Sequence, residues 1–423
     1  MLLEKIVLTF LKEQKPIEKP LLLGFSGGED SLTLAHCLKQ LKIPFHLAHF
    51  DHGWREKSAA EAQKLQEWAD EQNIPFHTKR STHPEKNELA AREERFEFFK
   101  NLFETDSFHA LVLAHHQLDQ TETILKRVFE GAHLTTLKGI QPLAARGAMP
   151  IWRPLLEVSK ECIRAYLQTW TLTPIDDETN RDSKYLRARM RQNLLPTLSK
   201  EFGKEIAPSL NRLGKYSTRL EDYLTEKTAH FKPIEGLFGT FWDFSEAHPV
   251  EISFVLRQVI PSHSLFERIF QALEKGAANH RIAFSKNVAI IDRGRLFILK
   301  ENPPQFPQKV PLQEGTIHSE LWEWKISFSE KVSEAQSSTS HWEEWWKGKI
   351  SLALPKGNYD LAPADSSFRK RWNAQKIPAF LRDSLPIVME KGKPVGQFFT
   401  ESPNATGLQI SIVLVHKNAN VIH

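Results

Sequence analysis

Leu21-Leu22-Leu23-Gly24-Phe25-Ser26-Gly27-Gly28-Glu29-Asp30-Ser31 is the stretch that decides the fold of this 423-residue chain. Its apolar start predicts a short buried strand, Leu21–Phe25. Apolar residues at helical spacing then predict a helix over Leu32–Leu41. The small residues between them turn the chain. A strand, a small-residue turn and a helix together direct backbone N–H groups and the positive end of a helix dipole toward an anion.

The side chains of this turn suit a phosphate group. Gly27 and Gly28 allow the backbone to approach a phosphate closely, Ser26 and Ser31 offer hydroxyl donors, and Asp30 suits a cation that neutralises the phosphates. An ordinary strand-to-helix turn capped by serine is the structural alternative. The string Ser-Gly-Gly-x-Asp-Ser resembles the pyrophosphate-binding loop of ATP pyrophosphatases, which adenylate a substrate. It lacks the lysine of the kinase and GTPase loop and the glycine spacing of dinucleotide-binding folds.

The composition is that of a soluble globular protein, with 40% apolar and 26% charged residues, which excludes a disordered chain. A net charge of +4 permits a nucleic-acid partner without establishing one. Cys37 and Cys162 are the only cysteines, so a disulfide framework and a Cys-x-x-Cys pair are excluded. The first helix-like stretch, Leu2 to Lys12, carries Glu4 and Lys5 within its apolar periodicity, so it does not show the uninterrupted apolar core expected of a secretory signal. The sequence also has no run of about 18 apolar residues. We therefore expect a cytoplasmic protein with no membrane partner.

Short apolar runs alternate with amphipathic stretches through the first 150 residues. The predicted strands are Leu21–Phe25, Phe45–Phe50, Ile74–Lys79 and Ala110–Ala114. The predicted helices are Leu32–Leu41, Lys57–Gln72, Asn87–Phe103 and Thr121–Glu130. This order predicts an α/β fold, a parallel doubly wound sheet with helices on both faces.

Polar side chains follow three of these strands where they end. Ser26 to Gly28 follow the first strand, His49 to Arg55 end the second, and His115 to Glu122 follow the fourth. Ligands of such sheets bind outside the carboxyl ends of the strands, so we expect these groups to lie close together. Asp119 and Glu122 then suit Mg2+ or a cationic nucleophile. A capping box at a helix start is the structural alternative for the same spacing.

Further motifs follow the loop in order. They are His49-Phe-Asp51-His52-Gly53-x-Arg55, Ala91-Arg92-x-x-Arg95-Phe96, Ala114-His115-His116-x-x-Asp119-Gln120-x-Glu122-Thr123, Arg153-Pro154-Leu155-Leu156, Asp176-Asp177-x-Thr179-Asn180, Tyr185-x-Arg187-x-Arg189-x-Arg191 and Asn193-Leu194-Leu195-Pro196. With the loop they cover most of residues 20 to 200 and resemble the tRNA(Ile)-lysidine synthase family, of the PP-loop ATP pyrophosphatase superfamily. The segment Ile377 to Pro386 resembles that family's last domain.

The resemblance implies a ligase with an adenine nucleotide alpha hydrolase-like catalytic domain. Such an enzyme uses ATP and Mg2+ to join free L-lysine to the 2-position of the wobble cytidine in the CAU anticodon of isoleucine tRNA. The reaction passes through an adenylated base and releases AMP and pyrophosphate. The product tRNA reads AUA and is charged with isoleucine instead of methionine. A homodimer is compatible with this function.

The resemblance also implies roles for individual residues. Catalysis is expected from Asp30, Asp51, His52, His115, Asp119, Glu122 and Arg189. ATP binding is expected from Ser26, Gly27, Gly28, Glu29, Asp30, Ser31, His49 and Arg92. Mg2+ binding is expected from Asp30, Asp119 and Glu122. The segment Arg181–Arg191 has five basic residues against one acid, which favours contacts with RNA phosphates, although a solvated helix face is the structural alternative.

The sequence pattern after about residue 200 differs from that of the first part of the chain. This change predicts two smaller domains, which are expected to bind tRNA. The expected boundaries are 1–210 for the catalytic domain, 211–302 for a linker helix and a mainly helical α+β domain, and 303–423 for a β-rich domain. The α+β domain is expected to end in a hairpin around Asp292-Arg293-Gly294. In the β-rich domain, Ser333–Ser340 is a predicted loop, and five tryptophans favour a core or an interface over a base-stacking surface.

Two other functions stay open on sequence grounds. Another PP-loop tRNA-modifying adenylating enzyme would share the loop, although the cysteine pairs of a thiolase and a glutaminase domain are missing. The second is a non-catalytic RNA-binding relative. Leu118 favours it, because the family usually has an acid there, next to Asp119. The intact Ser26, Asp30, Asp51 and Glu122 favour an enzyme.

Overall fold

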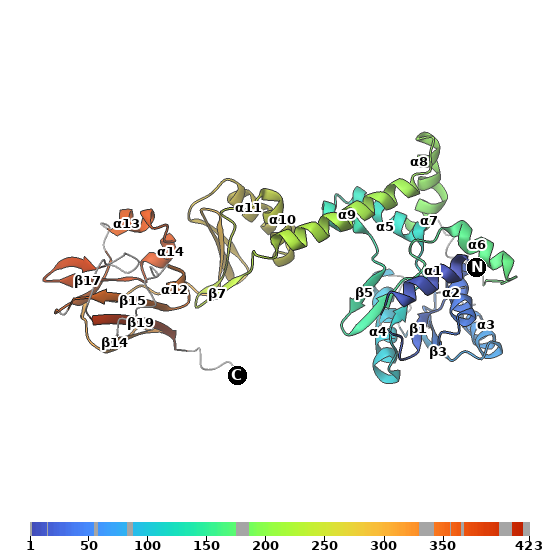
Figure 1. Cartoon of the computed structure of the whole chain (residues 1–423), viewed down its shortest axis with the longest axis horizontal. Coiled ribbons are helices and arrows are strands. Elements are labelled where there is room, and N and C mark those ends of the chain that lie inside the picture. The colour runs from blue at the N-terminus through green and yellow to red at the C-terminus, as the bar shows by residue number, and fades with distance from the viewer. Residues whose placement is uncertain are drawn as a thin grey trace. The chain divides into compact units, whose positions relative to one another are not determined.

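The computed structural model describes residues 2–14, 16–54, 58–82, 88–174, 186–329, 342–355, 357–364, 368–396 and 408–417. The chain forms two compact units, Met1–Tyr223 and Leu224–His423. Figure 1 labels their helices and strands. Arg55, Asp176–Asn180, Arg181–Tyr185 and Ser333–Ser340, which carried predictions above, lie outside the described residues. The predicted boundaries at 210/211 and 302/303 stay predictions.

The first unit is built on a sheet of six strands in the order β3-β2-β1-β4-β6-β5. Its strands are β1 Leu21–Gly24, β2 Phe45–Asp51, β3 Phe76–Arg80, β4 Leu111–Val112, β5 Leu143–Arg146 and β6 Met149–Trp152. Its helices are α1 Leu2–Lys12, α2 Glu29–Gln40, α3 Ser58–Glu71, α4 Glu88–Asp106, α5 Gln117–Phe129, the 3-10 helix η1 Leu134–Lys138, α6 Lys160–Thr169, α7 Leu186–Arg189, the π-helical turn Met190–Leu194, α8 Leu195–Glu201 and α9 Ala207–Thr228, which extends past the unit's end.

The predicted parallel α/β sheet is confirmed. β1 pairs in parallel with β2 through Leu21 and Phe45, and with β4 through Leu22 and Leu111. The chain adds β2 and β3 on one side of β1 and β4 on the other. The order of winding therefore reverses between β1 and β4, where doubly wound sheets bind their ligands beyond the carboxyl ends of the strands.

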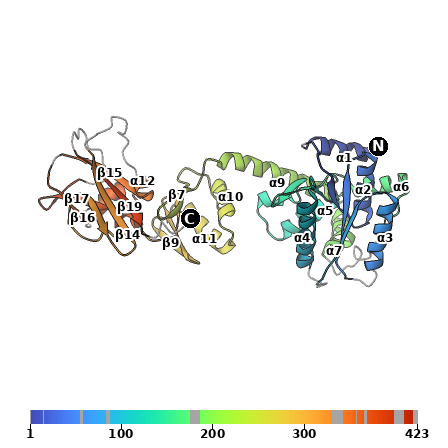
Figure 2. The ribbon, with the colours of Figure 1, turned by 90° about the horizontal axis from the view of Figure 1, so that it is seen from below.

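Both faces of this sheet are covered, because its central strands are apolar on both sides. Leu21 and Leu23 of β1 belong to a buried cluster with α1, α2, α3 and α6. Leu22 belongs to a cluster on the opposite face, with Phe96 and Phe99 of α4. Figure 2 shows α4 on one side of the strands and α2 and α3 on the other.

Several element boundaries differ from the predictions. α2 starts at Glu29 rather than Leu32, which places the acids Glu29 and Asp30 in its first turn, where the helix dipole favours negative charge. α5 starts at Gln117 rather than Thr121, because His116 caps it. The sequence prediction also missed the antiparallel β5–β6 hairpin and α6.

The described residues of the second unit form three antiparallel sheets, of five, four and four strands. Its strands are β7 Ile234–Gly236, β8 Gly239–Asp243, β9 His280–Phe284, β10 Asn287–Asp292, β11 Arg295–Leu299, β12 Val310–Pro311, β13 Gly315–His318, β14 Trp322–Ser329, β15 Lys349–Leu354, β16 Asp360–Pro363, β17 Pro386–Glu390, β18 Lys393–Gly396 and β19 Leu408–His416. Its helices are α10 Pro249–Val259, α11 His263–Glu274, α12 Trp342–Trp346, α13 Phe368–Ala374 and α14 Ala379–Arg382.

Two predictions for this unit are confirmed. β10 and β11 form the expected hairpin, in which Asp292 pairs with Arg295 and the turn residues Arg293 and Gly294 have φ values of 53° and 82°. The tryptophans expected in a core, Trp322, Trp324, Trp342, Trp345 and Trp346, are all buried in one apolar cluster. The indole of Trp345 donates a 2.7 Å hydrogen bond to the hydroxyl of Ser384, so its one polar atom is satisfied within that core.

None of the helices in the described part of the chain has the length and apolarity that crossing a bilayer requires.

Candidate active site

The Ser-Gly-Gly turn connects β1 to α2 and is closed by its own serine hydroxyls. Ser31 Oγ donates to the carbonyl of Gly28 at 3.3 Å and accepts from the backbone N–H of Ser26 at 3.2 Å. Gly28, not a serine, occupies the N-cap position of α2, and no side chain of that residue caps the helix. The serine-capped turn considered above is therefore not what the chain forms. The first-turn N–H groups of α2 are the arrangement that binds phosphate oxygens.

Gly27 gives a prediction for this turn because its φ is +75°. Gly27→Ala strains the backbone by about 1–2 kcal/mol and shifts the N–H groups, so KM for ATP should rise about tenfold, equivalent to about 1.4 kcal/mol. Gly147→Ala is the matched control, because Gly147 also has a positive φ, +61°, but lies in the β5–β6 turn with open space around it. Thermal unfolding should show a similar loss of stability in both variants, and ATP titration a weakened affinity only in Gly27→Ala. Equal ATP affinities would contradict the role of the turn.

Asp30 and Glu29, in the first turn of α2, are both paired with Lys160 from the start of α6. Lys160 Nζ lies 2.6 Å from Asp30 Oδ1 and 2.9 Å from Glu29 Oε2. Arg164 Nε lies 3.7 Å from the same Glu29 oxygen. Burial acts to raise the pKa of Glu29, but Lys160 and Arg164 outweigh it and lower that pKa. A lysine thus lies beside the phosphate-binding turn, which the sequence motifs did not reveal.

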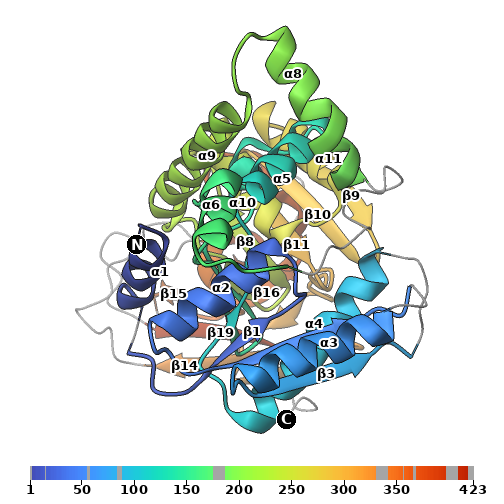
Figure 3. The same ribbon diagram turned by 90° about the vertical axis from the view of Figure 1, so that its right-hand side faces the viewer.

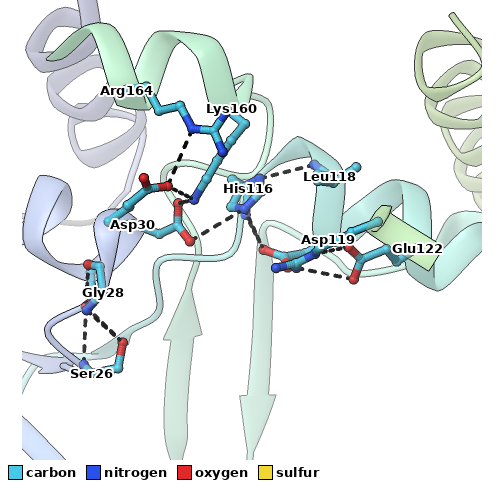
Figure 4. A network of polar contacts seen from close by, with 12 residues as sticks. Ser26, Gly28, Asp30, His116, Leu118, Asp119, Glu122, Lys160 and Arg164 are labelled. Atoms are coloured by element: carbon cyan, nitrogen blue, oxygen red, sulfur yellow. Dashed lines mark hydrogen bonds and ion pairs between the residues drawn. The ribbon is translucent and has the colours of Figure 1, made fainter. Parts of the chain in front are cut away.

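His116 lies between two carboxylates. Its Nε2 is 3.6 Å from Asp30 Oδ2 and 3.6 Å from Asp119 Oδ2, and Figure 4 shows these two acids on opposite sides of the ring. Its Nδ1 accepts the backbone N–H of Leu118, which places the ring proton of neutral His116 on Nε2. The ring is 1% exposed, and burial lowers its pKa although Asp119 and Asp30 oppose the change. Neutral His116 therefore directs an N–H group between Asp30 and Asp119.

Asp119 and Glu122 on α5 share one guanidinium. Arg191, in the π-helical turn, donates to Asp119 Oδ1 at 2.6 Å and also bonds both carboxylate oxygens of Glu122. Burial acts to raise the pKa of Asp119, but His116, His115 and Arg191 outweigh it and lower that pKa. Glu122 is 2% exposed, and burial raises its pKa despite Arg191. Asp119 is therefore the readily ionised member of the pair.

Asp119 also belongs to a capping box, because its Oδ2 accepts the backbone N–H of His116 at 2.8 Å. Helix capping, the structural alternative for Asp119, is thus correct, but the capping box uses only one of the two carboxylate oxygens of Asp119. The other faces Arg191. Glu122 has no part in the capping box, so helix capping alone does not explain the acidic pair.

Three other predicted residues, His49, Asp51 and His52, lie at the carboxyl end of β2. His49 Nδ1 lies 3.0 Å from the carbonyl of Phe25 and so joins the ends of β2 and β1. Asp51 is buried, accepts the N–H of Gly53 at 2.8 Å and lies 3.5 Å from Arg80. Burial, together with the charge of Arg95, lowers the pKa of His52 to about 4.

His115 is hydrogen-bonded to Arg153. Arg153 Nε donates to His115 Nδ1 at 3.3 Å and Nη1 donates to the carbonyl of Gln141 at 2.8 Å. Burial lowers the pKa of His115, and it lowers the pKa of Arg153 to about 10. Arg92 and Arg189 are exposed, and the Arg92 guanidinium lies 5.2 Å from the centre of the Phe96 ring.

The structure therefore brings Asp30, Asp119 and Glu122 together as predicted, with His116 between the first two. The sequence placed His116 at the end of the fourth strand but gave it no role, and sequence reasoning missed Lys160 and the part played by Arg191. Ser159, which caps α6 by accepting the N–H of Cys162, was the signal that could have located that helix. Nothing in the sequence indicated that Lys160 would face Asp30.

The carboxylate oxygens of Asp30 and Asp119 suit Mg2+ that enters the site bound to ATP. Mg2+ is usually bound through one or two carboxylates and the substrate's phosphates, and protein cages built only for it are uncommon. Asp30 and Asp119 offer carboxylate oxygens on either side of His116. Within the described residues no cluster of three or more His, Cys, Asp or Glu side chains forms a ready-made metal site. The arrangement suits a metal ion completed by phosphate oxygens.

Comparison with known proteins extends over nearly the whole chain. Residues 3–198 match the PP-loop domain family. A tRNA(Ile)-lysidine synthase from Protochlamydia amoebophila is 30% identical over 92% of this chain and 91% of its own length. One from Chlamydia trachomatis serovar D is 42% identical over 60% of this chain and 80% of its own. Among solved structures, a U34-tRNA thiolase from Methanococcus maripaludis is 14% identical with a TM-score of 0.42, covering 51% of this chain and 78% of its own.

The first of these relatives covers both units, and the PP-loop match contains the turn, Asp30, Asp119 and Glu122. The chain belongs to the tRNA(Ile)-lysidine synthase family.

Proposed function

We propose that this protein joins free L-lysine to the 2-position of the wobble cytidine in the CAU anticodon of isoleucine tRNA. The reaction consumes ATP and passes through an adenylated base. The observation that supports this most directly is the placement of Asp30, His116 and Asp119 beyond the carboxyl ends of β1 and β4, beside an uncapped helix N-terminus. At that position a turn suited to the phosphates of ATP lies beside carboxylates suited to hold the amine of lysine.

In the first step the 2-carbonyl oxygen of cytosine attacks the α-phosphorus of ATP. A phosphorus–oxygen bond forms, the bond to the bridging oxygen breaks, and pyrophosphate leaves. Negative charge develops on the leaving oxygens, which the N–H groups of Gly28 and of the first turn of α2 stabilise. Lys160 lies 2.6 Å from Asp30 and brings a positive charge to the same place. Mg2+, when bound by Asp30 and Asp119, would neutralise phosphate charge.

In the second step the amine of lysine attacks carbon 2 of the base, and AMP leaves with the former carbonyl oxygen. An ammonium ion must lose a proton to become this nucleophile. Asp119 suits the task of orienting the ammonium, because its lowered pKa keeps it ionised, and Glu122, whose pKa is raised, is the stronger base of the pair for accepting the proton. No covalent intermediate on the protein is required.

The tRNA must present its cytidine unstacked from the anticodon loop, and single-stranded RNA of this kind is held by stacking and by charge. Arg187 and Arg189 on α7 are exposed and lie close in sequence to Arg191, which contacts the acidic pair. We infer that they contact phosphates near the target base. We also infer a cytoplasmic enzyme, since its substrate is tRNA.

The test is incubation of the full-length protein with ATP, labelled lysine and an isoleucine tRNA bearing a CAU anticodon. The proposal expects lysine-modified tRNA, with AMP and pyrophosphate released in equal amounts. The same tRNA with a UAU anticodon is the control and should remain unmodified. Pyrophosphate release without lysine incorporation would favour another adenylating modification. If tRNA binds but no pyrophosphate appears, the protein is a non-catalytic RNA-binding relative.

A further inference from the structure

The part of α9 that belongs to the first unit carries a row of basic and aromatic side chains, Arg212, Tyr216, Arg219 and Tyr223. Their spacing of four, three and four positions places them on one side of the helix. All of them are exposed, and each tyrosine is 59% exposed. At about 1.5 Å per residue this row, the α9 stripe, is about 16 Å long.

The start of α9 is held against the helix that carries the catalytic acids. The hydroxyl of Thr121 in α5, the neighbour of Glu122, donates to Asn211 Oδ1 at 3.2 Å. Asn211 directly precedes Arg212, and Figure 3 shows α5 and α9 side by side. One end of the α9 stripe is therefore close to the turn of α5 that carries Asp119 and Glu122.

A different face of α9 is bonded to η1. The hydroxyl of Ser217 donates to the carbonyl of Leu134 at 2.6 Å. Lys138 Nζ lies 2.7 Å from Glu221 Oε1, so this acid of α9 already has a cation. These contacts fix the orientation of α9 in the first unit and leave the α9 stripe facing solvent.

The α9 stripe contains no acid, and its positive charge is not neutralised within the described part of the chain. Arg212 donates to Ser209 Oγ at 3.2 Å, but neither Arg212 nor Arg219 has an ion-pair partner among the described residues. Lys215, on another side of α9, is instead paired with Glu157 at 2.8 Å. Guanidinium groups next to phenol hydroxyls are donors that suit the phosphate oxygens of a nucleic acid.

We propose that the α9 stripe binds the sugar–phosphate backbone of the anticodon stem of the substrate tRNA. The inference rests on the proposed function and adds the place where the stem next to the reacting loop is held. Double-stranded RNA is recognised mostly through its phosphates and 2′-hydroxyls, which Arg and Tyr contact without reading a sequence. A solvated helix face would account for the arginines but not for two tyrosines exposed beside them.

The first test measures the affinity of the full-length protein for tRNA at several salt concentrations. Each phosphate contact adds about 0.7–0.9 to the slope of log Kd against log salt concentration. The double variant Arg212→Gln, Arg219→Gln should therefore lower this slope by about 1.4–1.8. It should also raise Kd about tenfold or more. KM for ATP and for lysine should stay unchanged.

The matched control is the double variant Lys5→Gln, Lys64→Gln. It removes the same charge from exposed positions of α1 and α3 in the same unit. Its Kd for tRNA and its salt dependence should match those of the wild type. An equal loss of slope in both double variants would mean that net charge, and not the α9 stripe, governs binding, and it would contradict the inference.

The tyrosines allow a separate measurement, because their hydroxyls are neutral. Tyr216→Phe, Tyr223→Phe keeps both rings and removes both hydroxyl donors. Kd for tRNA should rise about threefold to tenfold, while the slope against salt should stay at the wild-type value. An unchanged Kd would remove the tyrosines from the RNA surface.

A neutral backbone in the RNA tests the assignment to the stem. An anticodon stem-loop with methylphosphonate linkages in place of the stem phosphates should bind the wild type about tenfold more weakly than the unmodified stem-loop does. Arg212→Gln, Arg219→Gln should bind the two stem-loops almost equally, because the contacts are already lost. If the variant loses as much affinity as the wild type, its arginines do not contact the stem, and the inference is wrong.

Lysine incorporation into tRNA by the wild type separates failure of this inference from failure of the proposed function. If the wild type modifies tRNA but the arginine variant keeps the wild-type salt slope, the α9 stripe is not the RNA surface. If the variant changes only the sedimentation of the protein without RNA, the stripe is a protein–protein surface, and the inference is again wrong. If the wild type binds tRNA without modifying it and the slope still falls, the proposed catalysis fails while the stripe assignment stands.

Discussion

Asp30→Asn is expected to lower the rate of tRNA adenylation about a thousandfold, the upper part of the range for removing one preorganised charge from a reaction centre. Asp30 lies at the centre of the site, with Lys160 at 2.6 Å and His116 Nε2 at 3.6 Å from its two oxygens. The asparagine keeps the size of the side chain but loses the charge that would hold Mg2+ beside the phosphates. Lys160 also loses its ionic partner.

The measurement is pyrophosphate release in a single turnover with saturating ATP and tRNA. Asp106→Asn is the matched control, since Asp106 ends α4 and is exposed, away from the Ser-Gly-Gly turn. It should retain the wild-type rate. A rate for Asp30→Asn within about threefold of wild type would mean a barrier change of well under 1 kcal/mol and would remove Asp30 from the mechanism.

Arg191→Leu is expected to destabilise the first unit by about 3 kcal/mol, because it leaves two buried carboxylates without their shared cation. Asp119 and Glu122 both bond Arg191, and Glu122 is 2% exposed. The double variant Arg191→Leu, Glu122→Gln should regain most of this loss, because the most buried charge is then gone. Arg191→Lys should be less destabilised than Arg191→Leu. Chemical denaturation measures all three.

The pH dependence of the stability of Arg191→Leu tests whether the unpaired buried carboxylates cause the loss of stability. Loss of Arg191 raises the pKa of Glu122 further above its unfolded value, so the folded variant binds a proton more tightly than the unfolded chain does. Stability of a protein with such a group falls as pH rises. The deficit of Arg191→Leu relative to wild type should therefore be smaller near about pH 5 than near about pH 8. A deficit independent of pH, with no rescue by Glu122→Gln, would assign the loss to packing instead.

The parts of the fold that local patterns specify were predictable from the sequence. The turn at Gly27 and Gly28, the four predicted strands β1 to β4 and the hairpin at Arg293 and Gly294 depend on residues close together in the chain. The β5–β6 hairpin was missed because Ala144 and Ala145 give it no apolar alternation and Pro150 argues against a strand.

The candidate site was predictable only in part, because its contacts join distant segments. Its acids were found, since strand ends of a parallel sheet converge at one edge. Lys160 lies 130 positions from Asp30, and Arg191 lies 72 positions from Asp119. No local pattern pairs such residues. The π-helical turn that carries Arg191 likewise has no sequence signature, and a histidine N-cap such as His116 is uncommon.

The central claim is that this site activates the 2-carbonyl oxygen of the target cytidine by transferring AMP to it. The most direct measurement uses isoleucine tRNA with oxygen-18 at that position of the wobble cytidine, incubated with the protein, ATP and lysine. The account predicts that the label leaves the tRNA and appears in the phosphate of AMP, one atom for each lysine attached. Label that stays in the modified tRNA, or AMP that carries none, would contradict it.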